Sequence, residues 1–276
     1  MKKIELHTYD AKAIKDNAKW HYDRIPKLME TIRQKEISLD GLYDRCKVLA
    51  IYEYILNRNE KECLKYIDYS MKALLGHFEQ ASYPGQEVEI EICGEKINVR
   101  GKESEDYKLG PMFWLEGIYM AIILRDKESI LKFMNIPIQV MLNANMNDEE
   151  LFMVFVFFLK NYLSSNKDTG ELLIDAYKLT DPKLYEPERN LFIQNTITPQ
   201  LELFISMIKD DQIEFDKDLE KALTRFKSFY NQMPKEEYGL MSFPFIAICI
   251  LAKERGLKIE IESDYTPKFL IEGIFK

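Results

Sequence analysis

The sequence predicts a mainly α-helical protein. Three observations support this: glycine and proline are scarce, apolar residues recur at three- and four-residue steps along most of the chain, and strict alternation occurs in one stretch only. The chain has 276 residues, 46% hydrophobic and 30% charged, which is ordinary for a globular protein. We therefore expect antiparallel helical hairpins packed in one compact domain, residues 1–276, with a small inserted β-hairpin at about residues 86–100.

Apolar spacing predicts three helices before this hairpin. The first covers about residues 11–33, and Pro26 is a candidate kink or break within it. The second covers residues 39–56. The third begins after Asn59, because Asn59 and Glu62 have the spacing of a capping box, in which each side chain accepts the other residue's backbone N–H.

Between residues 87 and 99, the spacing of apolar residues changes from three or four positions to two. The segments Glu-Val-Glu-Ile-Glu-Ile (87–92) and Lys-Ile-Asn-Val (96–99) alternate strictly around a turn that contains Gly94, which is typical of a β-hairpin. One face would carry the apolar residues and the other Glu87, Glu89 and Glu91. This is the only substantial β element that the sequence predicts.

Helices resume at Pro111, a favoured first-turn residue. Asp126 is expected to cap the next helix, and Asn147 with Glu150 forms a second capping box. Further helices are predicted at residues 169–179, 187–208, 216–231 and 243–255, the one over 187–208 with a kink at Pro199.

The strongest core candidates are Trp114 and the apolar runs 151–159 and 243–252, because faces so apolar are unstable in water. Both runs are shorter than the ~20 residues of a membrane span, so no membrane partner is expected. Residues 52–66 align with 119–133 without a gap. This fits a repeat of α-hairpins, and equally any two antiparallel helix pairs.

Charge and cysteine usage narrow the class of protein. The formal net charge is -8, which disfavours nucleic acid and fits a basic partner, although acidity also simply keeps proteins soluble. The four cysteines, Cys46, Cys63, Cys93 and Cys249, form no C-x-x-C pair, and the first residues lack the apolar core of a secretory leader. We therefore expect a cytoplasmic protein with reduced thiols that act as small apolar residues.

Motifs for catalysis are missing. His7, His21 and His77 lie far apart without a metal-binding pattern, so packing or exposed roles are favoured over a metal site. The sequence has no nucleophile elbow, P-loop or dinucleotide-binding motif. We accordingly predict no catalytic, cofactor-binding or metal site and no enzyme. A hydrolase with a site invisible to motif reading is the third class considered.

Two blocks of the chain resemble a known family. The first runs from the hairpin through Gly110-Pro111, Trp114, Ala121, Arg125-Asp126, Leu131 and Pro137. The second, residues 239–267, is an apolar helix, the stop Arg255-Gly256 and an alternating stretch that ends in Tyr265 and Pro267. In order and spacing these blocks resemble family-49 immunity proteins, bacterial proteins that neutralise toxins of polymorphic toxin systems. The family often has a glycine- and proline-containing loop before its tryptophan, where this chain has charged residues at 102–107.

The resemblance implies a helical, cytoplasmic, non-enzymatic bacterial protein. It would bind a cognate toxin domain and occlude its active or substrate site. Two acidic strips would steer a basic toxin, and the candidate partner-binding residues are Glu87, Glu89, Glu91, Glu260, Glu262, Asp264 and Tyr265. The second strip is equally an amphipathic edge whose acids face water. The alternative function is a helical-repeat scaffold that binds a peptide or regulatory protein. The oligomeric state is not predicted.

Overall fold

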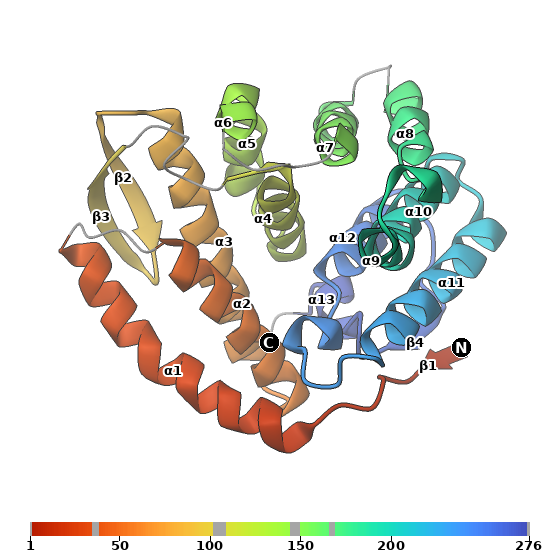
Figure 1. The fold of residues 1–276 in the computed structure, drawn as a ribbon, viewed down its shortest axis with the longest axis horizontal. Helices are drawn as coiled ribbons and strands as arrows, with labels where there is room; N and C mark the ends of the chain where they lie inside the picture. The colour runs from red at the N-terminus through yellow and green to blue at the C-terminus, as the bar shows by residue number, and fades with distance from the viewer. Residues whose placement is uncertain (1, 35–38, 102–108, 144–149, 166–168, 275–276) are drawn as a thin grey trace. The chain divides into compact units, whose positions relative to one another are not determined.

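A computed structural model describes residues 2–34, 39–101, 109–143, 150–165 and 169–274 (Figure 1). Helices dominate this part of the chain, which confirms the mainly α class. The chain divides into two compact units. We call residues 11–148 with 275–276 the hairpin unit, and residues 1–10 with 149–274 the C-terminal unit. The single compact domain stays a prediction.

The hairpin unit is built around one helix, α3. Its elements are α1 (Ala11–Arg33), α2 (Leu39–Ile55), α3 (Glu60–Ser82), β2 (Glu87–Ile92), β3 (Glu95–Arg100), α4 (Pro111–Leu124), α5 (Lys127–Asn135) and α6 (Ile138–Asn143). Helix α3 packs against α2, α4, α5 and the β-hairpin (Figure 1). Helix α1 continues through Pro26 without a break.

The same turn joins α2 to α3 and α4 to α5. Arg58 and Arg125 adopt left-handed conformations, with φ of 50° and 56°, and each is followed by the cap of the next helix. The Asp126 carboxylate accepts two backbone N–H groups at 3.1 Å, as predicted. The shared turn fits the aligned segments 52–66 and 119–133, although a true repeat stays a prediction.

The capping box predicted at Asn59 is half formed. Asn59 Oδ1 accepts the Glu62 N–H at 3.2 Å, but the Glu62 carboxylate pairs with Lys65 at 2.6 Å. The Asn59 N–H instead donates to the Glu53 carbonyl. The backbone of the preceding helix end therefore supplies the acceptor that the glutamate would have offered.

The β-hairpin forms where the alternation predicts it. Strands β2 and β3 pair antiparallel from Glu87 opposite Arg100 to Ile92 opposite Glu95. Cys93 and Gly94, both at positive φ, form the two-residue turn. The apolar face packs on α3 at Gly76, where a Cβ would lie 3.2 Å from Ile90. Among the described residues, the other sheet is a parallel pair of three-residue strands, which the sequence analysis missed.

The C-terminal unit holds this second pair and a set of packed helices. Its elements are β1 (Lys2–Ile4), α7 (Glu150–Leu163), α8 (Thr169–Lys178), η2 (Pro182–Leu184), α9 (Pro187–Phe192), η3 (Ile193–Ile197), α10 (Thr198–Ile208), α11 (Gln212–Tyr230), η4 (Glu237–Leu240), α12 (Phe243–Glu254), β4 (Ile261–Ser263) and α13 (Lys268–Glu272). Strand β1 lies alongside β4 although the two are at opposite ends of the sequence (Figure 1). Helix α10 packs against α8, α11 and α12.

Two predicted helices differ in detail. Helix α11 begins at Gln212, four residues earlier than predicted, because Asp211 caps it by accepting the Glu214 N–H at 3.0 Å. The helix predicted over residues 187–208 contains a π turn, in which the Thr198 N–H donates to the Ile193 carbonyl. Pro199, which lacks an N–H, follows this irregularity. The capping box predicted at Asn147 lies outside the described residues.

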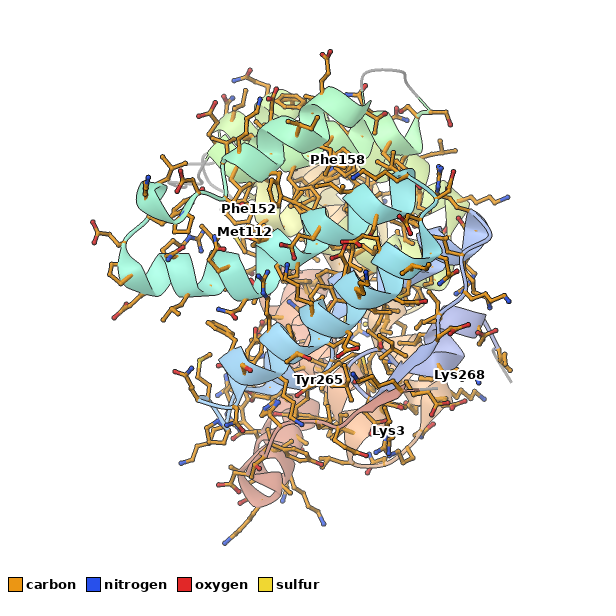
Figure 2. All side chains as sticks on the ribbon, turned by 90° about the vertical axis from the view of Figure 1, so that its right-hand side faces the viewer. Lys3, Met112, Phe152, Phe158, Tyr265 and Lys268 are labelled. Carbon is orange, nitrogen blue, oxygen red and sulfur yellow. The ribbon has the colours of Figure 1, made fainter. Side chains whose placement is uncertain are left out.

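The predicted core residues are buried in both units. In the hairpin unit Trp114 is 0% exposed, and its indole N–H donates to the Phe133 carbonyl at 2.8 Å. In the C-terminal unit the apolar residues of 243–252 are buried, as are six residues of 151–159, including Phe152 and Phe158 (Figure 2). Phe157 is 37% exposed. Within the described ranges, no helix combines the length and apolar character that crossing a bilayer requires.

Candidate partner-binding surfaces

The hairpin strip lies on a surface of mixed charge. Glu87, Glu89 and Glu91 are exposed on one face of β2, as predicted. Their cross-strand partners on β3 are Arg100, Asn98 and Lys96, and directly opposite residues share a face. Alternation in the sequence indicates the acids of β2 but not the cations that the register places beside them.

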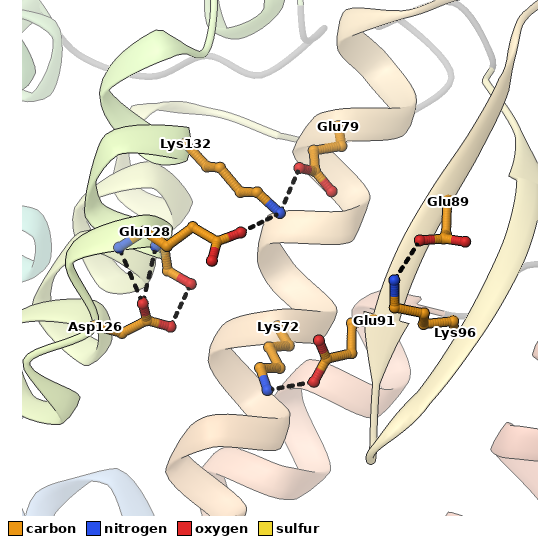
Figure 3. A network of polar contacts seen from close by, with 9 residues as sticks. Lys72, Glu79, Glu89, Glu91, Lys96, Asp126, Glu128 and Lys132 are labelled. Carbon is orange, nitrogen blue, oxygen red and sulfur yellow. Dashed lines mark hydrogen bonds and ion pairs between the residues drawn. The ribbon is translucent and has the colours of Figure 1, made fainter.

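Lysines pair with two of these glutamates (Figure 3). Lys96 Nζ lies 2.8 Å from the Glu89 carboxylate, and Lys72 Nζ of α3 lies 2.6 Å from that of Glu91. The hydrogen bond from Lys72 is the main cause of a lowered Glu91 pKa. Exposed ion pairs contribute only about 0–1 kcal/mol, so a partner with better-placed cations can replace these lysines at little cost.

The strip continues into a larger acidic network. Lys132 of α5 lies 3.7 Å from Glu79 of α3 and 3.5 Å from Glu128 (Figure 3). Lys72 also lies 3.2 Å from Asp68. We call the set around these lysines the acidic network. It comprises the carboxylates of Asp68, Glu79, Glu89, Glu91, Asp126 and Glu128 and the lysines Lys72, Lys96 and Lys132. Because the network has six carboxylates and three lysines, its net charge is negative.

The C-terminal strip also lies beside a lysine, Lys3. Glu260 is exposed, whereas Glu262 and Asp264 are half-buried. Strand β4 pairs with β1 so that Glu262 lies opposite Lys3. Lys3 forms its closest ion pair with Glu5, at 2.9 Å, and this contact is the main cause of its raised pKa. The strip is therefore shorter and more enclosed than its sequence suggests.

Tyr265 is buried within the C-terminal unit. It is 0% exposed and lies beneath α11, with its ring 5.3 Å from that of Phe226 (Figure 2). Its hydroxyl accepts the His7 backbone N–H at 2.6 Å and lies 2.9 Å from His7 Nδ1. Its carbonyl accepts the Ser242 N–H at 2.8 Å. Burial raises the Tyr265 pKa to about 12. These contacts give Tyr265 a structural role in joining three segments.

A shallow recess of about 470 Å³ lies elsewhere in the C-terminal unit. It is lined by Tyr162, Leu163, Ser165, Thr169, Ile208, Leu251, Glu254 and Arg255. The Arg255 guanidinium is held by the Asp210 carboxylate at 2.8 and 3.0 Å and by the Met207 carbonyl at 3.2 Å. In the sequence, Arg255 is recognisable only as part of a helix stop, because its partners lie more than 40 positions away.

The histidines are not brought together into a metal site in the described residues. His7 lies in the C-terminal unit, whereas His21 is on α1 and His77 on α3 of the hairpin unit. Within the described ranges, no group of three His, Cys, Asp or Glu side chains has the spacing to hold a metal ion.

Comparison with protein families identifies the chain. The model described as Immunity protein 49 matches residues 56–270, more than half of the sequence. The chain belongs to the Immunity protein 49 family. Comparisons with the curated proteins and with the solved structures gave no match. The family match includes both acidic strips and reaches into both units, which confirms the family that the sequence analysis suspected.

Proposed function

We propose that this chain binds a cognate bacterial toxin domain and neutralises it by occluding its active or substrate site. The observation that carries the proposal is the Immunity protein 49 match over residues 56–270. Neutralisation by binding needs a preformed surface and no catalytic group. The protein would act stoichiometrically, in the cytoplasm, without cofactor or metal.

The surface chemistry supports a basic toxin. The chain carries a net charge of -8, and the acidic network places six carboxylates and three lysines on α3, on α5 with its cap, and on the β-hairpin. A toxin that acts on nucleic acid needs basic residues at its substrate site. Acidic side chains would pair with those cations and cover the site. The exposed glutamates Glu87, Glu89, Glu91 and Glu260 are the best placed of the candidates, whereas Glu262 and Asp264 are half-buried.

The test begins with a search of the adjacent open reading frame for a toxin domain. The purified toxin is titrated with the full chain, and both complex formation and residual toxin activity are measured. We expect activity to fall linearly and to vanish at an equimolar ratio, with inhibition relieved by excess substrate. Loss of activity at a small fraction of equimolar protein would indicate catalysis. Absence of any complex would overturn the proposed function.

A further inference from the structure

One of the two tryptophans of the chain is exposed in the hairpin unit. Trp20 of α1 is 45% exposed, whereas Trp114 is 0% exposed. An indole has a large apolar surface, so a partner that covers an exposed one gains much of its binding energy there. Apolar side chains that are exposed singly are ordinary on protein surfaces, and the neighbours of Trp20 therefore decide whether it marks a site.

Two arginines share the Trp20 ring. The guanidinium carbon of Arg24, one turn further along α1, lies 4.1 Å from the ring centroid, and that of Arg45 on α2 lies 4.2 Å from it. Both distances are within the range of a cation–π contact. The ring of His21 meets the indole in a T-shaped arrangement, with 4.9 Å between the centroids. Neighbours on two packed helices thus hold the indole in place before a partner binds.

These two arginines differ from others of the chain in their lack of a counter-ion. Arg33, Arg225 and Arg255 each pair with a carboxylate. Among the described residues, neither Arg24 nor Arg45 does so, and Arg45 Nε is buried without a hydrogen-bond partner. A guanidinium stays charged at any physiological pH. Two like charges therefore lie beside one exposed ring, where an anionic group of a partner would be attracted to both.

We propose that Trp20, Arg24 and Arg45 form a contact site for the toxin domain, in which the two guanidiniums bind a carboxylate of the toxin and the indole packs against the same toxin segment. The proposal rests on the proposed function. The parallel N–H donors of a guanidinium match the two oxygens of a carboxylate. Tryptophan and arginine are also among the residue types that most often dominate the energy of an interface.

A protein carboxylate fits this site better than the phosphates of a nucleic acid. The net charge of -8 opposes the approach of a polyanion, and binding to a phosphate backbone gains its affinity from many lysines and arginines. A single acidic side chain on a basic protein meets no such opposition, because the rest of that protein is attracted to the chain.

This site would complement the acidic network. Attraction between the network and the cations of a toxin brings the two proteins together but leaves several orientations open. A second contact of opposite sign, from two arginines to a toxin carboxylate, selects one of them, because charge complementarity also sets register. We therefore expect the site around Trp20 to affect mainly the dissociation rate of the complex.

The experiment labels only this chain with fluorotryptophan and records its fluorine NMR spectrum. The chain has two tryptophans, so two resonances are expected, and a Trp20→Phe variant assigns them. When an equimolar amount of unlabelled toxin is added, the Trp20 resonance should shift, whereas that of the buried Trp114 should stay in place. Sedimentation of the same sample shows whether the complex has formed.

The outcomes separate this proposal from the proposed function. An unshifted Trp20 resonance in a sample that contains the complex would overturn this proposal and leave the proposed function standing. Absence of the complex would overturn both. A shift that appears when this chain alone is concentrated, and not when toxin is added, would assign the surface to a second copy. A shift with single-stranded DNA and not with toxin would assign it to nucleic acid. Either of these results would also overturn the proposal.

Variants measure the contribution of each side chain. Trp20→Ala should raise the Kd of the complex at least about thirtyfold, and Arg24→Gln and Arg45→Gln should each raise it about tenfold. Lys15→Gln is the matched control. It also removes one positive charge from an exposed position of α1, about 140° around the helix from Trp20, and should change Kd less than about twofold.

The sign of the effect excludes net charge as its cause. Removing a cation from this acidic chain strengthens its long-range attraction to a basic toxin, so weaker binding would come from the lost contact. Equal weakening in Lys15→Gln and the two arginine variants would contradict the proposal. Circular dichroism of each variant checks the fold, and the wild-type spectrum decides the proposal even if Trp20→Ala fails to fold.

Discussion

At the scale of single residues, Tyr265 shows that a local sequence pattern does not by itself predict whether a side chain is exposed. It ends a stretch of alternating acids and therefore looked like part of an exposed strip. Its hydroxyl is instead bound by His7, 258 positions away in the sequence. No short-range pattern encodes that contact, because the N-terminal strand that brings His7 there has only three residues.

The Tyr265 hydroxyl is expected to contribute to stability. Tyr265→Phe keeps the ring but leaves the His7 backbone N–H without its acceptor. A buried polar group that loses its partner costs about 1–3 kcal/mol, so the free energy of unfolding should fall by that amount. Urea unfolding measures it. Tyr83→Phe, at a side chain that is 51% exposed, is the control and should change stability little. Equal losses in the two variants would contradict the structural role of Tyr265.

The surroundings of His7 predict that the free energy of unfolding depends on pH. Burial, with a smaller effect of Lys227, lowers the His7 pKa in the folded protein. Its Nε2 is buried without a hydrogen-bond partner in the described residues, so a second ring proton there would be costly. Above the unfolded-state pKa of about 6.5, both states are neutral at His7 and its contribution to stability is fully present. Below that pH the unfolded state binds a proton that the folded state does not, and stability is lost.

The measurement is urea unfolding between pH 7 and pH 5.5. The wild-type free energy of unfolding should fall more steeply on acidification than that of His7→Asn, by at most about 1.4 kcal/mol per pH unit. Parallel curves would show that His7 is protonated equally in the two states.

At the scale of elements, several signals contained within a turn or two were read correctly from the sequence. The cap at Asp126, the helix start at Pro111 and the Cys93-Gly94 turn all formed where predicted. Each depends on backbone groups three or four positions away. Most features that were missed are non-local, such as the β1–β4 pairing and the lysines beside the hairpin glutamates, although the local cap at Asp211 was missed as well. Their partners are set by packing.

Helix α7 offers a matched pair of phenylalanines. Phe155 is 0% exposed and its ring packs edge-on against Phe204, whereas Phe157 on the same helix is 37% exposed. Phe155→Ala removes a fully buried ring and should cost about 3–5 kcal/mol. Phe157→Ala should cost far less, since part of its surface is already in water. Thermal and urea unfolding of both variants test this, and a Phe155→Ala protein that melts like wild type would show that the run is not central.

Adding a single methyl group at Gly117 should lower the stability of the protein. A Cβ there would lie 2.4 Å from Cζ of Phe133, which is 0% exposed, so α4 and α5 cannot keep their present separation. Overpacking of this kind costs about 1–3 kcal/mol, so Gly117→Ala should destabilise the protein. Gly170→Ala on α8 is the control: no atom lies within 4 Å of its added Cβ, and alanine favours helix by about 1 kcal/mol. If Gly117→Ala were as stable as Gly170→Ala, the protein would not have the close contact between Gly117 and the Phe133 ring.

At the scale of the whole molecule, the candidate surfaces were predicted in part. The sequence identified acidic strips because alternation shows which side chains share a face. It did not show that Lys72, Lys96 and Lys132 lie among the acids, nor that carboxylates of α3 and α5 extend the hairpin strip into the acidic network. Composition gives a net charge but not its distribution. The structure makes the hairpin surface the larger of the two acidic surfaces and the C-terminal strip the more enclosed.

This difference leads to a prediction about toxin binding. One variant replaces Glu87, Glu89 and Glu91 by lysine, and the other replaces Glu260, Glu262 and Asp264. The two variants have the same net charge, so each controls for the other. If the acidic network steers a basic toxin, the hairpin variant should bind about tenfold more slowly at low salt, with the larger loss in the association rate.

The measurement is association and dissociation of the toxin complex across a salt series. The difference between the hairpin variant and wild type should fade as the Debye length falls to ~8 Å at physiological ionic strength, because the charges involved are exposed. Dissociation should change less, since buried contacts set it. An equal slowing in both variants would assign steering to net charge alone. Unchanged association in both would remove the strips from the mechanism, whereas the immunity proposal itself depends on whether wild-type protein forms the complex.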